Sequence, residues 1–378
     1  MAAKVLNCTS YNDNPYHELL FGSIRDRYVP RKGVPADAIT QKAAILHVHW
    51  EEHCLRKART AVEAKHLSAD FLQGLSAAKS KGIKIVWTIH NITPHELEYV
   101  EVFLELRKKL ADIAERILVH NLQSISELRK QGVNCLEKFF LLPHPSYIGI
   151  YPELEANLAT ISDKTSSDRT YRNNPSSANT GFLAFGMVRR YKNLEFLLDV
   201  LNESPQILET TSLRVMGSVF KDDPYGDELQ SKYGHLAGLT LSFERVPDEA
   251  LGDMFASASC LILPYKRFLT SGAALLGITA GVPIVAPDCA QMRELLPPQN
   301  HEYLFQPGNA DSLKTCLVKL RDLSQEETGT LKNACRKRAE QYHPSKISTK
   351  LGQLYDSLRG VTQKHKIEQP SIASSTSS

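Results

Sequence analysis

The stretch CLILPYKRFLTSGAALLGITAGVPIVA, from Cys260 to Ala286, decides the fold class of this chain. It opens with a short apolar run (Cys260–Pro264) and closes with a run rich in β-branched residues (Val282–Ala286). Between them lie a polar turn, an apolar helix-like segment and Gly281, which suits a tight turn. Such a strand–helix–strand order predicts a parallel sheet that helices cover on both faces.

Part of this stretch has an alternative interpretation as a membrane span. Residues 268–287 carry no charge and approach the roughly 20 residues that a spanning helix needs. However, Gly272, Gly277, Gly281 and Pro283 interrupt the segment, whereas spans favour longer uninterrupted apolar runs. We therefore favour a buried helix followed by a buried strand.

The same alternation of apolar runs and amphipathic segments extends along the 378 residues in two series. The first series predicts strands at Lys4–Ser10, Ala44–His49, Ile83–His90, Ile117–His120 and Phe139–Leu142. The second predicts strands at Phe182–Gly186, Leu213–Gly217, Leu239–Phe243, Cys260–Pro264, Val282–Ala286 and Tyr303–Phe305. Helices are expected at Cys54–Lys79, Glu96–Arg116, Asn193–Asn202 and Asp311–Leu323.

The two series predict two doubly wound, Rossmann-like α/β domains that face each other across a cleft. The first domain is expected at residues 1–156 and the second at 181–343, joined by a polar linker at 157–180 that has too few apolar side chains to fold alone. Residues 362–378 are rich in Ser and Thr and are expected to be disordered. Ligands of such sheets bind outside the carboxyl ends of the strands, so the residues that follow each strand are the candidates for a site.

Composition narrows the function classes. The net charge of +3 is small and its basic residues are scattered, which argues against a nucleic-acid binder. Seven cysteines without a C-x-x-C pair argue against a disulfide framework or a zinc module and favour a reducing compartment. The first residues lack the pattern of a signal peptide, so a cytoplasmic location is expected.

Histidines follow several strands of the first series. His47 and His49 lie on the same side of one expected strand, His90 and His120 end two others, and His95 precedes a helix. A neutral histidine can accept a proton from an attacking hydroxyl group or polarise a substrate oxygen. Each also has an ordinary interpretation as a hydrogen-bonded core residue, and His47 with His49 lacks a marked third ligand for a metal ion.

Helix starts in both series offer groups for an anion. Asn14 is expected to cap a helix that begins at Pro15, although this turn lacks the G-x-G-x-x-G pattern of an NAD-binding enzyme. In the second series Gly186 allows a turn that carries Arg189, Arg190 and Lys192 beside a helix start, which suits a diphosphate. The alternative is a solvated basic turn.

A second anion site is predicted at Thr270, Ser271 and Gly272, which supply hydroxyl groups and free N–H groups at a helix start. Its alternative is an ordinary helix cap.

These residues together resemble GT-B glycosyltransferases of the family 4-like group, including bacterial exopolysaccharide enzymes such as the xanthan-type mannosyltransferases. The resemblance extends from Asn14 to about Gln341. It rests on the motifs Asn14–Tyr16, His47–Trp50, Thr88–Asn91, Pro94–Glu96, Pro143–Pro145, Gly186–Lys192, Leu269–Gly272 and Gly281–Pro283.

The resemblance implies a nucleotide-sugar donor in the second domain and a glycan or glycolipid acceptor in the first. It implies that His90 lines the reaction centre as the catalytic residue, and that the helix near Pro344–Leu358 (residues 344–361) crosses back to the first domain. The implied diphosphate ligands are Gly186, Arg189, Lys192, Thr270, Ser271 and Gly272. The implied acceptor or sugar ligands are Asn14, Tyr16, His49, His120 and His144, and Glu294 is the implied nucleotide contact.

The chain departs from this family at one motif. Many relatives carry two glutamates separated by seven residues before the Gly-x-Pro turn, and the corresponding residues here are Phe268 and Leu276. Neither side chain can bind a ribose or sugar hydroxyl group, so the nucleotide contacts must differ or catalysis is weakened.

The resulting hypothesis is a cytoplasmic hexosyltransferase that needs no metal ion or other cofactor, because basic side chains neutralise the diphosphate. A catalytically silent GT-B subunit that binds a partner, and a GT-B sugar epimerase or phosphorylase, are the alternatives. The basic stretches Arg56–Lys57 and Arg107–Lys109 suggest peripheral membrane contact, although such stretches are also common on solvated surfaces. The sequence leaves open the donor base, the sugar, and whether its configuration is retained or inverted.

Overall fold

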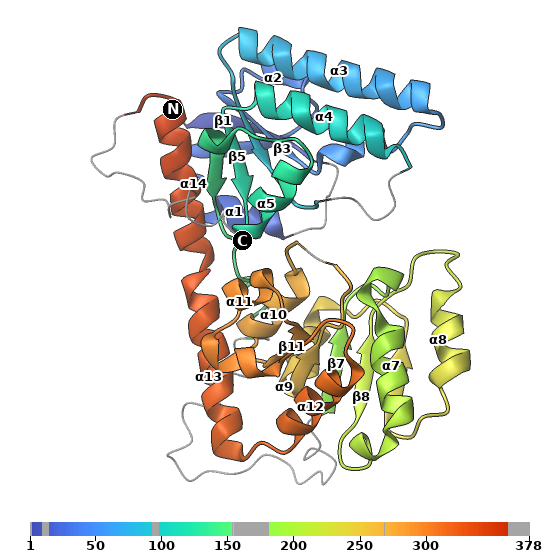
Figure 1. Ribbon diagram of the computed structural model, residues 1–378. Coiled ribbons are helices and arrows are strands. Elements are labelled where there is room, and N and C mark those ends of the chain that lie inside the picture. The colour runs from blue at the N-terminus through green and yellow to red at the C-terminus, as the bar shows by residue number, and fades with distance from the viewer. Residues whose placement is uncertain are drawn as a thin grey trace. The chain divides into compact units, whose positions relative to one another are not determined.

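The computed structural model describes residues 2–9, 15–92, 98–152, 154, 181–267 and 269–361. The chain forms two compact units (Figure 1). The first comprises Met1–Pro145 together with Pro344–Ser378, and the second comprises Ser146–His343. Each unit is built on a six-stranded sheet in which all paired strands are parallel.

The sheet of the first unit has the strand order β2-β1-β3-β4-β5-β6. Its strands are β1 (Ala3–Cys8), β2 (Tyr28–Lys32), β3 (Ile45–His49), β4 (Lys84–Thr88), β5 (Arg116–Val119) and β6 (Phe139–Leu141). The order changes direction between β1 and β3, so the loops after these two strands leave the sheet in opposite directions. Open α/β sheets bind their ligands at such a position.

Helices cover both faces of this sheet. They are α1 (Tyr16–Phe21), α2 (Asp37–Thr40), α3 (Ala61–Ser80), α4 (Val100–Ile113), α5 (Gln123–Lys130) and α14 (Pro344–Leu358). Val5, Ile45 and Val86 of the sheet form one core with Leu20 of α1 and Leu351 of α14. Helices α3 and α4 pack against each other away from that core (Figure 1).

The sheet of the second unit has the order β12-β11-β10-β7-β8-β9 and changes direction between β7 and β10. Its strands are β7 (Gly181–Phe185), β8 (Leu213–Met216), β9 (Leu239–Ser242), β10 (Ala258–Ile262), β11 (Ile284–Pro287) and β12 (Leu304–Phe305). Its helices are α7 (Leu194–Glu203), α8 (Tyr225–Tyr233), α9 (Leu251–Ala256), α10 (Gly272–Thr279), α11 (Ala290–Leu295), α12 (Ala310–Arg321) and α13 (Gln325–Gln341).

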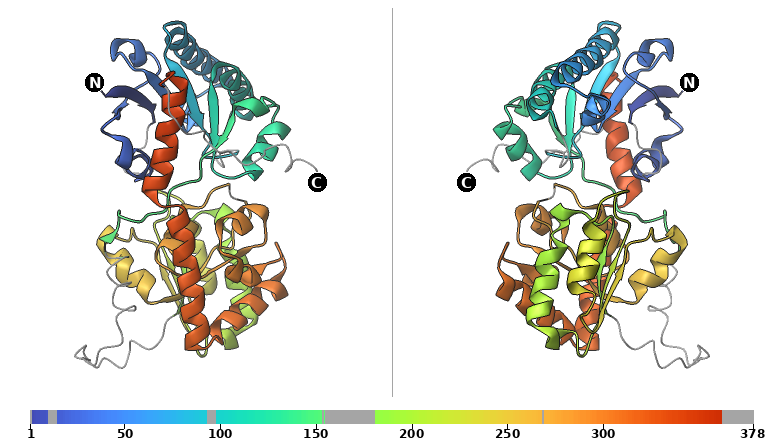
Figure 2. Two further views of the ribbon diagram at one scale, coloured as in Figure 1. Left: turned by 90° about the vertical axis from the view of Figure 1, so that its left-hand side faces the viewer. Right: turned by 90° about the vertical axis from the view of Figure 1, so that its right-hand side faces the viewer.

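Both faces of the second sheet are buried by helices. Successive side chains of a strand point to opposite faces, so neighbouring residues pack in different cores. Phe182 and Cys260 pack in a core with α7, α8 and α12, whereas Leu183 and Leu261 pack in a core with α9, α10 and α13. In Figure 2, α13 faces the viewer on the left, and α7 and α8 face the viewer on the right. Burial on both faces explains why these strands are continuous apolar runs.

The expected strands are present, most with bounds within two residues of the prediction, but the structure adds one that the pattern did not predict. Strand β2 has the sequence Tyr28-Val-Pro-Arg-Lys, with exposed Arg31 and Lys32. Proline removes a backbone donor and is tolerated mainly at the edge of a sheet, where β2 lies. Because of this composition, β2 lacks the apolar run by which the other strands were predicted.

Two segment boundaries also differ. The helix expected at Cys54–Lys79 is divided into a 3₁₀ turn at Glu51–Leu55 and α3, because the Thr60 side chain caps the start of α3. Residues 146–154 were expected in the first domain, but the Ser146 N–H group donates to the Tyr342 carbonyl at 2.8 Å and Leu154 packs in a core of the second unit. The expected linker at 157–180 and tail at 362–378 lie outside the described residues.

The uncharged stretch at 268–287 forms α10 and β11 of the second unit. Within the parts of the chain that the structure describes, no helix has both the length and the apolar character required to cross a membrane.

Candidate functional site

Glycines shape the carboxyl ends of β7 and β8 in the second unit. Gly186 follows β7 with a φ of +102°, which residues other than glycine rarely adopt. A Cβ atom there would lie 2.9 Å from Nζ of Lys192, so glycine leaves space for this ammonium group. Gly217 follows β8 with a φ of +144°, and a Cβ on it would collide with the carbonyl group of Gly186. Neither position accepts a side chain without movement of its neighbours.

Lys192 is the buried cation of this region. Only 9% of its surface is exposed, and no carboxylate among the described residues forms an ion pair with it. Its Nζ atom lies 5.4 Å from the centre of the Tyr265 ring. Burial, with a smaller effect from Arg189, lowers the pKa of Lys192 from 10.5 to about 8. A buried charge without a counter-ion is unfavourable, so the arrangement favours binding of an anion.

The two neighbouring arginines differ in their surroundings. The Arg189 guanidinium stacks 3.9 Å from the centre of the Phe220 ring, which is half exposed. Arg190 pairs with both carboxylate oxygens of Glu228 on α8, at 2.8 and 2.9 Å. Arg189 therefore stacks on an aromatic ring beside Lys192, whereas Arg190 pairs with an acidic side chain.

The start of α10 borders Lys192 through Tyr265. Burial raises the pKa of Tyr265 well above 10, and the adjacent Ser271 side chain opposes that effect. Ser271 caps α10, since its Oγ accepts a hydrogen bond from the Ala274 N–H group at 3.1 Å. The Oγ1 atom of Thr270 is buried and has no hydrogen-bond partner among the residues described. We call Gly186, Lys192, Tyr265, Ser271 and Gly272 the anion site.

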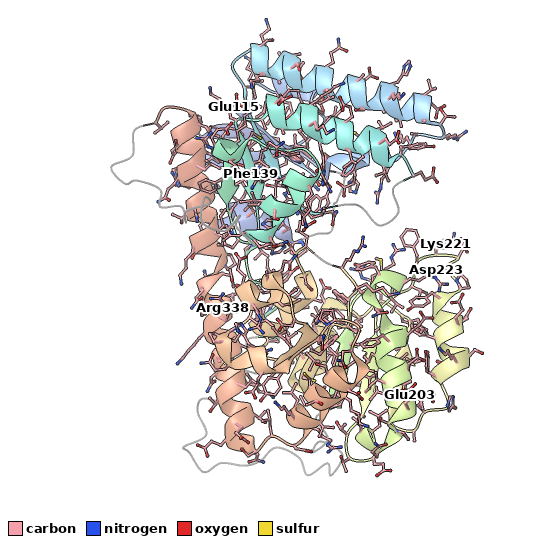
Figure 3. The ribbon with its side chains drawn as sticks, viewed as in Figure 1. Glu115, Phe139, Glu203, Lys221, Asp223 and Arg338 are labelled. Carbon is pink, nitrogen blue, oxygen red and sulfur yellow. The ribbon has the colours of Figure 1, made fainter. Side chains whose placement is uncertain are left out.

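Glu294, the expected nucleotide contact, lies on α11. Its carbonyl oxygen accepts hydrogen bonds from Arg338, labelled in Figure 3, and from the Tyr342 hydroxyl group. Its side chain is half-buried. Of the two positions where relatives carry glutamate, Leu276 is buried in a core of the second unit, and Phe268 lies outside the described residues.

In the first unit, the carboxyl ends of β1, β3, β4, β5 and β6 each deliver a ring to one cluster. Tyr16 is its centre, and the other ring centres lie between 4.9 and 6.1 Å from that of Tyr16. We call this set the aromatic cluster; it comprises Tyr16, His17, His49, Trp50, His90, His120 and His144. The structure thus brings Tyr16, His49, His90, His120 and His144 together as expected neighbours, while Asn14 and His95 lie outside the described residues.

The histidines of the aromatic cluster are uncharged near neutral pH. Burial lowers the pKa of His17 and His120 to about 4 and that of His144 to about 3. Burial and the neighbouring histidines hold the pKa of His49 and His90 well below 6.5. The cluster therefore offers neutral hydrogen-bonding groups rather than positive charge.

Hydrogen bonds fix how these rings can act. Nδ1 of His120 lies 2.8 Å from the Leu142 carbonyl oxygen, so Nδ1–H donates and Nε2 is left as an acceptor. Nδ1 of His49 lies 3.0 Å from Nε2 of His90, and Nε2 of His49 is buried without a partner among the described residues.

Because buried unpaired N–H groups are rarer than unpaired acceptors, we assign the proton of His49 to Nδ1. His49 then donates to Nε2 of His90, which places the proton of His90 on its own Nδ1. His90 stacks on Trp50 with ring centres 3.8 Å apart, and Trp50 holds the left-handed φ of +47°. Backbone strain of this kind is concentrated at functional sites.

Both ring nitrogens of His47 are hydrogen-bonded within the protein. Its Nδ1 lies 2.6 Å from the Tyr355 hydroxyl group of α14 and its Nε2 lies 2.7 Å from Oγ1 of Thr88. Both nitrogens are occupied, so His47 orients its neighbours. In the described part of the chain, no three His, Cys, Asp or Glu side chains are grouped so that they could hold a metal ion.

Sequence reasoning missed a buried ion pair behind His90. Arg107, expected on a basic surface, is wholly buried, and its Nε donates to Glu51 at 2.7 Å. Its other nitrogens donate to the carbonyl oxygens of Asn91 and Ile92, directly after His90. Arg107 shares the buried face of α4 with Phe103 and Leu110, and this i, i+4, i+7 spacing was the signal in the sequence.

Glu52 lies beside this ion pair. Its Oε1 accepts a hydrogen bond from Asn91 Nδ2 at 2.8 Å. Burial and the neighbouring Glu51 raise the pKa of Glu52 to about 7, because one guanidinium group serves two carboxylates.

Comparisons with known proteins agree with this architecture. Residues 179–322 match the family described as glycosyl transferases group 1. A GDP-mannose:glycolipid 4-beta-D-mannosyltransferase of Xanthomonas campestris pv. campestris is 25% identical over 279 residues, which is 73% of this chain and 70% of the relative.

Two solved structures share the fold. Anabaena HepE in complex with UDP has a TM-score of 0.68 and 14% identity, covering 94% of this chain and 100% of that chain. A sucrose-phosphate synthase from Thermosynechococcus elongatus has a TM-score of 0.68 and 15% identity, covering 96% and 100%. Taken with the two doubly wound units, these matches show that the chain has the GT-B fold and that residues 179–322 match the glycosyl transferases group 1 family.

Proposed function

We propose that the chain transfers a hexose from a nucleoside-diphosphate sugar, bound by the second unit, to a hydroxyl group of a glycolipid or other glycan acceptor, bound by the first unit. The observation that carries the proposal is Lys192, a buried ammonium group without an acidic partner among the described residues, at the switch point of the second sheet. The mannosyltransferase relative is named for GDP-mannose and a glycolipid, and the Anabaena structures hold UDP or UDP-glucose, which supports this class of donor and acceptor.

Transfer breaks the bond between the anomeric carbon and the diphosphate oxygen. Positive charge then develops on the sugar and negative charge on the diphosphate. Lys192 and Arg189, together with the N–H groups at the start of α10, stabilise that negative charge. In this proposal these basic side chains neutralise the charge of the diphosphate, and no metal ion is required.

The aromatic cluster is proposed to bind the acceptor or the sugar being transferred. Neutral rings that carry N–H donors and bare nitrogen acceptors suit the alternating donor and acceptor character of hydroxyl groups. With its proton on Nδ1, His90 donates a hydrogen bond to a sugar or acceptor oxygen. Trp50 supplies an apolar face at the same place.

Titration calorimetry with GDP and UDP, and transfer assays with GDP-mannose and UDP-glucose, test the proposal. Lys192→Met keeps an unbranched apolar chain but removes the charge. Because hydrogen bonds to charged groups contribute about 1.5–3 kcal/mol, affinity for the bound nucleotide should fall roughly 10- to 100-fold. Lys232→Met is the matched control, since Lys232 is exposed on α8 and pairs with Asp199. Parental affinity in Lys192→Met would show that the donor site is misplaced.

A further inference from the structure

Tyr147 belongs to the second unit although it follows the last strand of the first. Its backbone N–H group donates to Oγ1 of Thr279, on α10, at 3.1 Å. Its side chain packs against the same core as α10, and its ring centre lies 5.9 Å from that of Tyr151. The position of Tyr147 is therefore fixed relative to α10 by both its backbone and its ring.

The hydroxyl group of Tyr147 lies at the first turn of α10. A Cβ atom on Gly272, the first residue of this helix, would be 2.9 Å from that oxygen. The oxygen therefore lies beside the first residue of α10. The N–H groups of this first turn have no carbonyl partner within the helix. Glycine at position 272 thus leaves the space that the tyrosine hydroxyl group occupies.

The same helix start borders the cation of the anion site. Lys192 is more than nine-tenths buried, has no acidic partner among the described residues, and contacts the Tyr265 ring. Tyr265 in turn lies close enough to Ser271, which caps α10, for the two side chains to interact. The hydroxyl group of Tyr147 and the ammonium group of Lys192 are therefore both placed around the first turn of α10, where the helix favours negative charge.

We infer that the Tyr147 hydroxyl group is a further ligand of the leaving diphosphate and donates a hydrogen bond to one of its oxygens. This inference rests on the proposed function, because it takes the anion site as the donor site. Burial raises the pKa of Tyr147 well above 10, so the group keeps its proton and remains a donor at physiological pH. The hydrogen bond strengthens as negative charge develops on the diphosphate, so it contributes to turnover as well as to binding.

Tyr147→Phe removes only the hydroxyl group, and Tyr151→Phe is the matched control on the neighbouring ring. We expect Tyr147→Phe to raise the Kd of the bound nucleoside diphosphate about tenfold and to lower kcat for transfer, since the lost hydrogen bond was made to a charged group. Tyr151→Phe should leave both values within about twofold of the parent. Equal values for Tyr147→Phe and the parent would overturn the inference.

Gly272→Ala provides a second, independent readout. The added Cβ atom displaces the tyrosine hydroxyl group in the parent, but it meets no such oxygen once residue 147 is phenylalanine. We therefore expect Gly272→Ala to weaken nucleotide binding more in the parent than in the Tyr147→Phe background, as residues in contact are not additive. Additive losses would contradict the placement of the hydroxyl group.

The Lys192→Met variant separates this inference from the proposed function. If Lys192→Met loses nucleotide binding and Tyr147→Phe does not, only the role of Tyr147 is wrong. If both variants bind the nucleotide like the parent, the donor site itself is wrong.

Discussion

Lys192→Met should make the ligand-free protein more stable while it weakens donor binding. In the folded chain the pKa of Lys192 is about 8, against 10.5 for an ordinary lysine. This difference of about 2.5 units corresponds to roughly 3 kcal/mol at about 1.4 kcal/mol per unit. Near pH 7, Lys192 is charged in both states, so that cost opposes folding, and methionine removes it. At about 2–4 °C per kcal/mol for a unit of this size, Tm should rise on the order of 10 °C.

The pH dependence of the stability difference provides a second test of this prediction. Between pH 8 and 10.5 the unfolded chain keeps its proton on Lys192 while the folded protein has released it. Because the unfolded state binds more protons in this window, the parent gains stability as the pH rises. The advantage of Lys192→Met should therefore be fully present below about pH 8 and should decrease steadily as the pH approaches 10.5.

Donor binding should show the opposite trend. A bound diphosphate favours the charged lysine, so affinity in the parent should decline above about pH 8, by up to about tenfold per pH unit. Thermal unfolding and calorimetry of both proteins at several values between pH 7 and 9.5 provide the measurement, with Lys232→Met as the surface control. A Met variant no more stable than the parent at pH 7, or an advantage that persists unchanged at pH 9.5, would refute the reasoning.

Three further changes test other parts of the structure. Arg107→Met leaves the carboxylate of Glu51 buried without its partner, so unfolding in urea should show a loss of about 3–5 kcal/mol. Gly281→Ala places a side chain at a φ of +68° and against Nε of Arg336; strain and collision together should cost about 1–3 kcal/mol, measured in the same way. His90→Ala should lower kcat more than it weakens donor binding, whereas His90→Asn, whose amide can replace Nδ1–H, should recover part of the turnover.

Each of these three predictions has an outcome that would contradict it. For the buried ion pair, a loss below 1 kcal/mol would show that Arg107 and Glu51 do not depend on each other. For the tight turn, Gly308→Ala is a useful control, because Gly308 also has a positive φ but has open space around it; equal losses would remove the contact with Arg336 from the explanation. If His90→Asn and His90→Ala were equally slow, the assigned proton position would be wrong.

Most of the fold could be predicted because both faces of each sheet are buried, which leaves continuous apolar runs in the sequence. β2 escaped prediction for the converse reason. It is an edge strand with Pro30, Arg31 and Lys32, and its pairing with β1 is a tertiary contact that local propensity does not report. The start of α3 likewise depends on the cap at Thr60 rather than on the hydrophobic period.

The candidate site was predictable where strand ends deliver chemistry directly. Parallel strands bring His49, His90 and His120 to one edge of a sheet, and the sequence shows them at those strand ends. Their protonation could not be predicted, because the low pKa of each ring results from burial among the others. The partners of Arg107 and Tyr147 could not be predicted either, because each side chain contacts residues that are distant in the sequence and become neighbours only on folding.

The position of α14 affects how the first unit can be made. Its Tyr355 orients His47, and its Asp356 accepts a hydrogen bond from Tyr28 at 2.6 Å and pairs with Arg27 at 2.5 Å. Ribosomal synthesis releases residues 1–145 well before this helix. While the second unit is still being translated, the sheet of the first unit therefore lacks the helix that covers part of its core. A fragment that stops at residue 145 would expose Val5, Ile45 and their neighbours. A recombinant version of the first unit alone should therefore graft residues 344–361 back through a short flexible linker.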